Sequence, residues 1–331
     1  MIKKHIRTNI KYLLLGLVVC GMLVSLTACK QNSQDVSIDQ SQNTKTVKIA
    51  KQYGLAYAPI TVMQELNFIH EEDPNLHVEW VQLGNTAAIR EAILTDELDI
   101  GFMGIPPYLI GVENGMNWQI FTGLSKAPLG LMSNDTSINS LKDINPSHKI
   151  ALPQPGSIQH ILLSMAAKRE MGDPKAFDNQ LVSLKHPDGV QMLLAGSEVT
   201  MHFTSPPFVF QEEEQGMKRV ISGEEAFGGP FTFIVGTLRE EILSDTQTVS
   251  SVNNALKRAI EYMNKNPEET VTLLSEVYGI EKSLLKTYLY DSGLEYSQKV
   301  EGLETFVDFM VEAKYLTHSI KEDTLLWSVE E

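Results

Sequence analysis

The chain has 331 residues, a formal net charge of -15 and only two cysteines, Cys20 and Cys29. Proteins that bind nucleic acid need a basic surface, so this acidic composition excludes nucleic acid as a partner. Residues 30–331 contain no cysteine and therefore no disulfide, thiolate metal site or cysteine nucleophile. We expect an ordinary apolar core, divided between two lobes.

Residues 1–28 are typical of a lipoprotein signal peptide. Basic side chains without any acidic one precede an apolar run that begins at Tyr12 and ends in Leu26-Thr27-Ala28-Cys29. Small residues followed by a cysteine resemble the lipobox of bacterial lipoproteins, which are cleaved before the cysteine and acylated on it. A plain signal peptide and a short membrane anchor are the alternatives. We therefore predict a lipid such as palmitate on Cys29, which tethers the protein to the extracytoplasmic face of the cell membrane.

Residues 29–45 are predicted to form a polar tether. The segment from Lys30 to Lys45 is nearly free of large apolar side chains, so it cannot form a core. Removal of residues 1–28 takes four positive charges from the formal net charge of -15 and leaves -19. This acidity keeps a tethered protein in solution and away from anionic lipid.

Strands alternate with helices in the first part of the body. The predicted elements are, in chain order, a strand at 47–50, a turn-rich loop at 53–59, a helix from about 60, a strand at 77–81, a helix at 87–94, a strand at 98–103 and a helix through 112. Thr86 is expected to be the N-cap of the second helix. The alternation predicts an α/β unit with a largely parallel sheet.

The same pattern restarts after a loop at 137–147. The predicted elements are a strand at 149–152, a helix capped by Ser157, a strand at 181–184, a helix at 189–195, a strand at 200–203 and a strand at 231–235. The chain then becomes mainly helical, with predicted helices at 249–265, 267–277, 282–290 and 303–313. We expect these helices to pack back on the first unit.

Two α/β units joined by two extended crossings predict a two-lobed protein. The crossings are predicted at 128–133 and 229–235, with residues 46–130 and 232–331 in lobe 1 and residues 131–231 in lobe 2. Open α/β sheets bind ligands at the carboxyl ends of their strands, so each strand-to-helix loop is expected to face the cleft between the lobes.

The strand-to-helix loops also carry a resemblance to a known family. The segments Gln52–Pro59, Gly101–Pro107 and Pro155-Gly156-Ser157 resemble the solute-binding lipoproteins of ABC importers, of the nitrate, sulfonate, taurine and thiamine-precursor group. The resemblance implies a type II periplasmic-binding-protein fold, with two lobes joined by two crossing strands. It also implies a small-molecule ligand and a membrane permease with its ATPase as partners. The chain lacks a phosphate-binding loop, so a partner must hydrolyse ATP.

Pro155-Gly156-Ser157 is the strongest candidate for ligand contact, because a helix N-terminus offers unpaired N–H groups and a partial positive charge. In the resembled sulfonate binders this loop holds the acidic head group, although Ser157 also serves simply as a helix cap. The full set of predicted ligand-binding residues is Tyr53, Tyr57, Asn85, Thr86, Gly104, Ile105, Pro106, Ser125, Gly156, Ser157, Ile158, Gln159, Thr204, Ser205 and Phe231. For Tyr53, Tyr57 and Thr86, packing or capping is the alternative role.

Other polar residues give weaker signals. Ser125 lies in a sequence close to a nucleophile elbow, but Pro128 follows instead of a helix, so a hydroxyl lining the cleft is the favoured role. The histidines are scattered and predict no metal site. His160 is expected on the solvated face of its helix, and the acidic run 212–214 is expected to be solvated surface.

We therefore predict a monomeric, membrane-tethered protein that captures a small ligand, either an anion like a sulfonate or nitrate or a pyrimidine-like compound. It is predicted to have no enzymatic activity, no cofactor and no metal. The alternative is an enzyme on the same fold that acts on a small metabolite. Some enzymes of that kind use cysteine-rich sites, which residues 30–331 cannot form.

Overall fold

The computed structural model describes residues 44–196 and 198–328. The predicted signal peptide, the predicted lipidation site Cys29 and the predicted tether up to residue 43 lie outside these described residues. Lys45 already belongs to the first strand, so the tether predicted through residue 45 ends earlier. None of the helices in the described part of the chain is long and apolar enough to cross a membrane.

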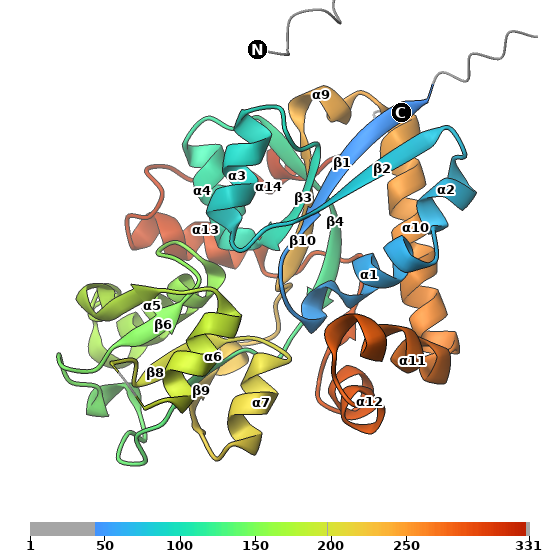
Figure 1. Ribbon diagram of the computed structural model, residues 1–331. Coiled ribbons are helices and arrows are strands. Elements are labelled where there is room, and N and C mark those ends of the chain that lie inside the picture. The colour runs from blue at the N-terminus through green and yellow to red at the C-terminus, as the bar shows by residue number, and fades with distance from the viewer. Residues whose placement is uncertain (1–43, 197, 329–331) are drawn as a thin grey trace, which may run out of the picture. The chain divides into compact units, whose positions relative to one another are not determined.

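Lobe 1 is built on a six-stranded sheet with the order β11-β4-β10-β3-β1-β2 (Figure 1). Its strands are β1 (Lys45–Lys51), β2 (Leu76–Gln82), β3 (Ile100–Gly104), β4 (Trp118–Lys126), β10 (Ile234–Arg239) and β11 (Glu295–Tyr296). Its helices are α1 (Ala58–Glu65), α2 (Phe68–Glu72), α3 (Thr86–Leu94), α4 (Ile105–Glu113), α9 (Glu240–Leu243), α10 (Thr246–Lys265), α11 (Pro267–Tyr278), α12 (Lys282–Tyr290), α13 (Leu303–Glu312) and α14 (Glu322–Leu325). Every residue of β3 is buried, as expected for a continuous apolar strand covered on both faces.

Lobe 2 is built on a five-stranded sheet with the order β7-β6-β8-β5-β9. Its strands are β5 (Gly130–Ser133), β6 (Ile150–Leu152), β7 (Leu181–Ser183), β8 (Met201–Thr204) and β9 (Lys218–Ser222). Its helices are α5 (Ile158–Met171), α6 (His186–Leu194), α7 (Phe208–Glu214) and α8 (Gly223–Phe227). Helix α5 is buried over most of its length and begins directly behind the loop after β6.

Both sheets are mixed, which corrects the prediction of a largely parallel sheet. Strand β10 runs antiparallel to β3 and β4 in lobe 1, and β5 runs antiparallel to β8 and β9 in lobe 2. Each of these two strands follows a crossing, so it enters its sheet from the side of the other lobe. The direction of entry makes it antiparallel to its neighbours.

Residues 127–129 and 228–233 form the two crossings between the sheets. A short segment after β11, residues 297–301, is hydrogen-bonded to the strand or crossing on both sides. Gly123 N–H donates to Gln298 O at 2.8 Å, and Glu301 N–H donates to Thr232 Oγ1 at 2.8 Å. The Glu301 carboxylate also pairs with Lys126 Nζ at 2.5 Å, where β4 ends. We call residues 297–301 the hinge strap.

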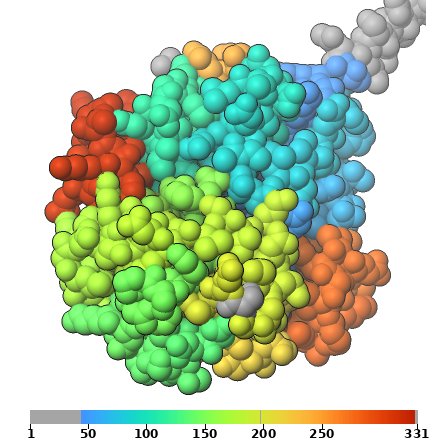
Figure 2. Space-filling view, turned by 60° about the vertical axis from the view of Figure 1, so that its left-hand side comes forward, coloured from blue at the N-terminus to red at the C-terminus, as the bar shows by residue number. Residues whose placement is uncertain are grey.

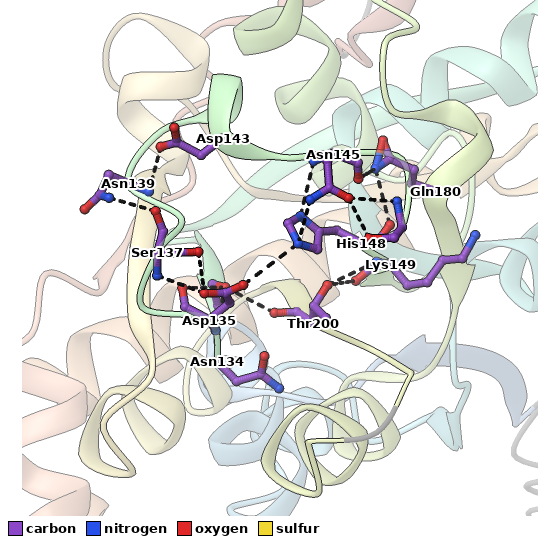
Figure 3. Close-up of polar contacts among 12 residues, drawn as sticks. Asn134, Asp135, Ser137, Asn139, Asp143, Asn145, His148, Lys149, Gln180 and Thr200 are labelled. Atoms are coloured by element: carbon purple, nitrogen blue, oxygen red, sulfur yellow. Dashed lines mark hydrogen bonds and ion pairs between the residues drawn. The ribbon is translucent and has the colours of Figure 1, made fainter.

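The loop before β6 is held by polar groups of its own and by Gln180 and Thr200 (Figure 3). Ser137 N–H donates to Asp135 Oδ1 at 2.8 Å, and Gln180 Nε2 donates to Asn145 O at 2.8 Å. Lys149 N–H donates to Thr200 Oγ1 at 3.1 Å and joins the loop to the start of β8. These contacts lie at the amino ends of β6 and β8, whereas ligands of open α/β sheets bind at the carboxyl ends.

Candidate functional site

A small cavity of about 30 Å³ lies between the lobes, at the carboxyl ends of their strands. Its lining residues are Gln52, Tyr53, Tyr57, Gly84, Thr86, Gly104, Pro107, Pro153, Ser157, Ile158, Gln159, His186, Ser205, Phe233 and Ile234. A larger hollow of about 580 Å³ lies beside α1, α2 and β2. Lobe 1 alone lines that hollow, and no carboxyl ends of facing strands meet there, so we place the candidate site in the cleft.

The lobes are in contact across the cleft. Leu55 N–H in lobe 1 donates to Pro206 O in lobe 2 at 3.0 Å, and Ala87 N–H in lobe 1 donates to Gln154 Oε1 in lobe 2 at 3.0 Å. In Figure 2 the green and yellow-green atoms of lobe 2 abut the cyan atoms of lobe 1 along the visible face. The structure therefore shows a closed arrangement of the two lobes.

Glycines in the loops of lobe 1 permit this contact. A Cβ atom on Gly54 would lie 2.8 Å from Pro206 O, and one on Gly104 would lie 3.1 Å from Ile158 Cβ. A Cβ on Gly84 would meet only the flexible end of the Lys185 side chain, at 2.6 Å. The loops after β1, β2 and β3 thus all face lobe 2, as the topology predicts.

Four helices begin at the cavity. They are α3 and α4 from lobe 1, with N-caps Asn85 and Gly104, and α5 and α6 from lobe 2, with N-caps Ser157 and Lys185. The first N–H groups of a helix have no partner within the helix, and the partial positive charge there favours anions. Among the described residues that line the cavity there is no Lys, Arg, Asp or Glu. The lining of the cavity therefore offers backbone and neutral side-chain donors, while the Lys185 side chain lies beside Gly84 at its edge.

Asn85, not Thr86, is the N-cap of α3, which corrects the predicted cap. Its side chain accepts from Ala88 N–H at 3.0 Å. Thr86 is the first residue of the helix, and its Oγ1 accepts from Gln52 Nε2 at 3.1 Å. Because Thr86 is the first helical residue and not the cap, its hydroxyl is free to face the cavity and Gln52.

His160 is buried, which corrects the prediction of a solvated side chain. Gly156 N–H donates to His160 Nδ1 at 2.9 Å, so Nε2 carries the proton and donates to Asp178 Oδ1 at 3.1 Å. Burial lowers the pKa of His160, which keeps the ring neutral and able to accept. Gly156 has a φ of 80°, and His160 thus holds the loop before α5 in a backbone conformation that suits glycine.

We expect His160→Ala to lower the free energy of unfolding by about 2 kcal/mol, because the Gly156 N–H loses its partner in a buried site. The same variant should weaken ligand binding, because the loop at the start of α5 loses its support. Denaturant unfolding and calorimetric titration measure the two effects. The control is His318→Ala, an exposed histidine whose removal should change stability by less than about 0.5 kcal/mol. Equal effects of the two variants would contradict the prediction.

Eight of the predicted ligand-binding residues line the cavity: Tyr53, Tyr57, Thr86, Gly104, Ser157, Ile158, Gln159 and Ser205. The other seven lie behind it or away from it. Asn85 and Gly156 shape helix starts, and Ile105 and Pro106 are buried in the first turn of α4. Thr204 Oγ1 lies 3.3 Å from His186 Nδ1.

Ser125 and Phe231 lie outside the cavity. Ser125 is buried in β4 beside Ile234 of β10, and its hydroxyl has no hydrogen-bond partner among the described residues. Phe231 lies in the second crossing and packs against Phe227 and Phe306, with ring centroids 4.9 and 5.8 Å away. Neither side chain is in a position to cover a ligand in the cleft.

Gln52, His186 and Phe233 line the cavity but were absent from the predicted set. Gln52 follows β1 directly, and His186 is the first residue of the helix after β7. Both therefore lie at strand carboxyl ends, and this topological signal was sufficient to find them. Phe233 lies in the second crossing, which carries no comparable signal.

His186 begins a line of buried polar groups that runs into lobe 2. Its Nε2 lies 3.1 Å from Gln159 Nε2, and its Nδ1 lies 3.1 Å from His202 Nε2. His202 Nδ1 in turn lies 2.6 Å from Glu212 Oε1. His202 and Glu212 are fully buried, so the prediction of Glu212 as solvated surface is wrong. No group of three His, Cys, Asp or Glu residues within the described ranges is arranged to hold a metal ion.

A second hollow of about 280 Å³, which we call the vestibule, adjoins the cavity. It is shared between the lobes, and Gln52 and Tyr53 line both spaces. Lys51 lies at its edge and donates to Thr61 Oγ1 at 2.9 Å. Tyr53 is among the more exposed large side chains, with 40% of its surface accessible, and it stands between the cavity and this vestibule.

Two lobes on separate α/β sheets, two crossings and a cavity at facing strand ends define a periplasmic-binding-protein fold. Solved structures support this class at low sequence identity. The alkanesulfonate-binding protein SsuA from Xanthomonas axonopodis pv. citri bound to MOPS is similar with a TM-score of 0.72, 16% identity and coverage of 85% of this chain and 98% of that chain. The nitrate-binding protein NrtA from Synechocystis PCC 6803 is similar with a TM-score of 0.66, 14% identity and coverage of 84% and 83%.

A third similar structure is the periplasmic aliphatic sulphonate binding protein SsuA from Escherichia coli, with a TM-score of 0.68, 17% identity and coverage of 86% of this chain and 93% of that chain. These likenesses confirm the predicted fold. A model of the NMT1-like family matches residues 40–277, and the chain belongs to this family. Comparison with curated proteins gave no match.

Proposed function

We propose that this protein is the solute-binding component of an ABC importer, which closes on a small oxyanion and delivers it to a membrane permease with its ATPase. The observation that carries the proposal is the cavity itself, where four helix N-termini and neutral donors meet and no acidic side chain is present among the described lining residues. An anion is the ligand that such an arrangement binds best. The similar structures of an alkanesulfonate-binding and a nitrate-binding protein support the same class.

The dimensions of the two spaces suit a ligand with a compact head group. A cavity of about 30 Å³ has room for roughly two water-sized groups, so a compact ligand suits it better than a large ring does. The organic part of a sulfonate would extend past Tyr53 into the vestibule of about 280 Å³. A pyrimidine-like ligand requires the lobes to open further than this.

The proposed ligand-binding residues are the eight predicted residues that line the cavity, together with Gln52 and His186. Lipidation of Cys29, attachment to the extracytoplasmic face of the membrane and action as a monomer remain part of the proposal. They are supported by the sequence of the first 29 residues and by the solute-binding function itself. An enzyme on the same fold is the alternative, and no group in the cavity favours it.

Thermal unfolding of the protein with methanesulfonate, nitrate, a pyrimidine and an amino acid tests the proposal. A ligand at a hundred times its dissociation constant stabilises a fold by about 2.7 kcal/mol, so it should raise the melting temperature by several degrees. We expect one of the two anions to do so and the amino acid to have no effect. If only the pyrimidine raises the melting temperature, the ligand is neutral and the anion proposal is wrong. Turnover of any of the compounds would favour the alternative, an enzyme on the same fold.

A further inference from the structure

Gln159, His186, His202 and Glu212 form a continuous hydrogen-bonded line, which we call the buried relay. It begins at the cleft, where Gln159 and His186 line the cavity, and ends 0% exposed inside lobe 2 at Glu212. The three distances along it are 3.1, 3.1 and 2.6 Å. A nearby serine, a water or a salt bridge would be enough to give the ring nitrogens of His186 their hydrogen-bond partners. A line of four residues therefore needs a further explanation.

A relay of neutral imidazoles can have either of two directions, because each ring has one donor nitrogen and one acceptor nitrogen. If Glu212 carries a proton, it donates to His202 Nδ1, His202 Nε2–H donates to His186 Nδ1, and His186 Nε2–H donates to the Gln159 amide oxygen. The Gln159 NH₂ group then faces the cavity as a donor. A half turn of the amide exchanges its oxygen and nitrogen at the position beside His186, so both directions fit the same distances.

If Glu212 is ionised, every hydrogen bond reverses. His202 Nδ1–H then donates to the carboxylate, His186 Nδ1–H donates to His202 Nε2, and the Gln159 NH₂ group donates to His186 Nε2. The Gln159 amide oxygen is left to face the cavity. The two states differ by one proton at Glu212, and they present opposite groups to a ligand.

We propose that the buried relay makes Glu212 a positioning residue for the ligand, which turns the Gln159 amide so that its NH₂ group donates to an oxyanion. This proposal rests on the proposed function and goes beyond it, because it assigns the choice between anionic and donor-bearing ligands to a group remote from the cleft. It also links anion binding to a proton on Glu212.

The surroundings of Glu212 favour the protonated form. Its Oε2 is buried and has no partner in the described part of the chain, which a neutral acid tolerates better than a carboxylate. Burial, together with the smaller effect of the Glu213 charge, raises the pKa of Glu212 to about 9. Burial lowers the pKa of His202 to about 3, so the imidazole beside Glu212 is neutral as well.

The charged and polar groups on the elements that pack against α7 do not offset this preference of Glu212 for its protonated form. Glu213 of α7 pairs with Arg219 of β9 at 2.8 Å, and Glu214 accepts from Tyr288 of α12 at 2.7 Å. Lys218 of β9 and Asp188 of α6 are the remaining charged groups on elements packed against α7. Beside His186, the Thr204 hydroxyl can donate or accept at 3.3 Å and so fits both directions, and Phe208 stacks on the ring with centroids 5.7 Å apart.

The first test uses methanesulfonate and nitrate, whose own charges do not change between pH 6 and 10. Calorimetric titration should give an affinity that falls about tenfold between pH 7 and pH 10, as Glu212 loses its proton. In Glu212→Gln the amide NH₂ donates to His202 Nδ1 at every pH, so this dependence should disappear. Glu213→Gln is the control one residue away on the surface. It should keep the dependence but move it to slightly lower pH, because the Glu213 charge contributes to the raised pKa of Glu212. The same decline in all three proteins overturns the proposal.

The second test needs no ligand and separates the two proposals. Nitrogen-15 NMR of the imidazoles should show His186 and His202 protonated on Nε2 at pH 7 and on Nδ1 at pH 10, with Nε2 protonation at both values in Glu212→Gln. If neither anion binds at any pH, the proposed function fails for these ligands while the NMR result still decides the relay. Unchanged tautomers across the range overturn the relay, even where binding is observed.

Discussion

Gly54→Ala should weaken ligand binding about a hundredfold. Gly54 has φ 119° and ψ 164°, a region that residues with a side chain hardly ever occupy. A Cβ atom there would also lie 2.8 Å from Pro206 O, the acceptor of the hydrogen bond from Leu55 N–H that joins the lobes. Strain and clash together favour separated lobes, and the apparent affinity falls with the fraction of closed protein.

The matched control is Gly115→Ala. Gly115 also has a positive φ, 84°, but no atom of the described residues lies within 4 Å of the Cβ position. The Gly115→Ala variant should therefore lose about 1 kcal/mol of stability and keep its affinity for the ligand. Calorimetric titration gives the affinities, and small-angle scattering reports whether ligand still compacts each variant. If both alanine variants bind equally well, the contact between Gly54 and Pro206 has no part in closure.

The free energy of unfolding should pass through a maximum near pH 6.5 and fall on both sides, because His202 and His186 together outweigh Glu212 below this pH. Burial lowers the pKa of His202 to about 3, below its unfolded value near 6.5, so the unfolded chain binds more protons and stability falls as the pH drops through this range. Burial raises the pKa of Glu212 to about 9, above its unfolded value near 4.5. The folded protein then binds more protons, so stability falls as the pH rises from 4.5 through 9.

Denaturant unfolding between pH 3 and 10 measures this profile. The alkaline fall should amount to several kcal/mol, since one unit of pKa shift corresponds to about 1.4 kcal/mol. Glu212→Gln should remove most of that fall and leave the acid side unchanged, because the acid side belongs to His202 and to His186, whose pKa burial also lowers. A variant with the same alkaline fall as the natural protein would show that Glu212 is ionised in the folded state at neutral pH.

The order of elements in lobe 1 and the helical carboxyl-terminal part were predictable from the sequence. The helix predicted at 282–290 matches α12, and the one predicted at 249–265 begins three residues late against α10. Long amphipathic periods carry this information locally. The strands β4 and β9 and the helices α7 and α8 were not predicted. β9, α7 and α8 have only five to seven residues, too few for a clear period, whereas β4 has nine residues, most of them buried, and shows no alternation.

The candidate site was predictable as a set of loops but not as a set of side chains. Strand carboxyl ends gave the loops of Tyr53, Thr86 and Ser157, since topology alone places them. Glu212 was assigned to the surface because three consecutive glutamates look solvated, although only packing of α7 against β5 and β9 decides which of them is buried. The contact between His186 and His202 spans 16 residues of sequence, and no periodic pattern encodes it.

The hinge strap has a mechanical consequence. Residues 297–301 hydrogen-bond to β4 at the first crossing and to Thr232 in the second, so neither crossing can bend without pulling on the other. We therefore expect the two connections to bend together, about one axis. With one such axis, a force on either lobe changes the opening angle wherever it has a moment about that axis. The permease that we propose as a partner would then release the ligand by holding both lobes at their outer surfaces, without contact with the ligand.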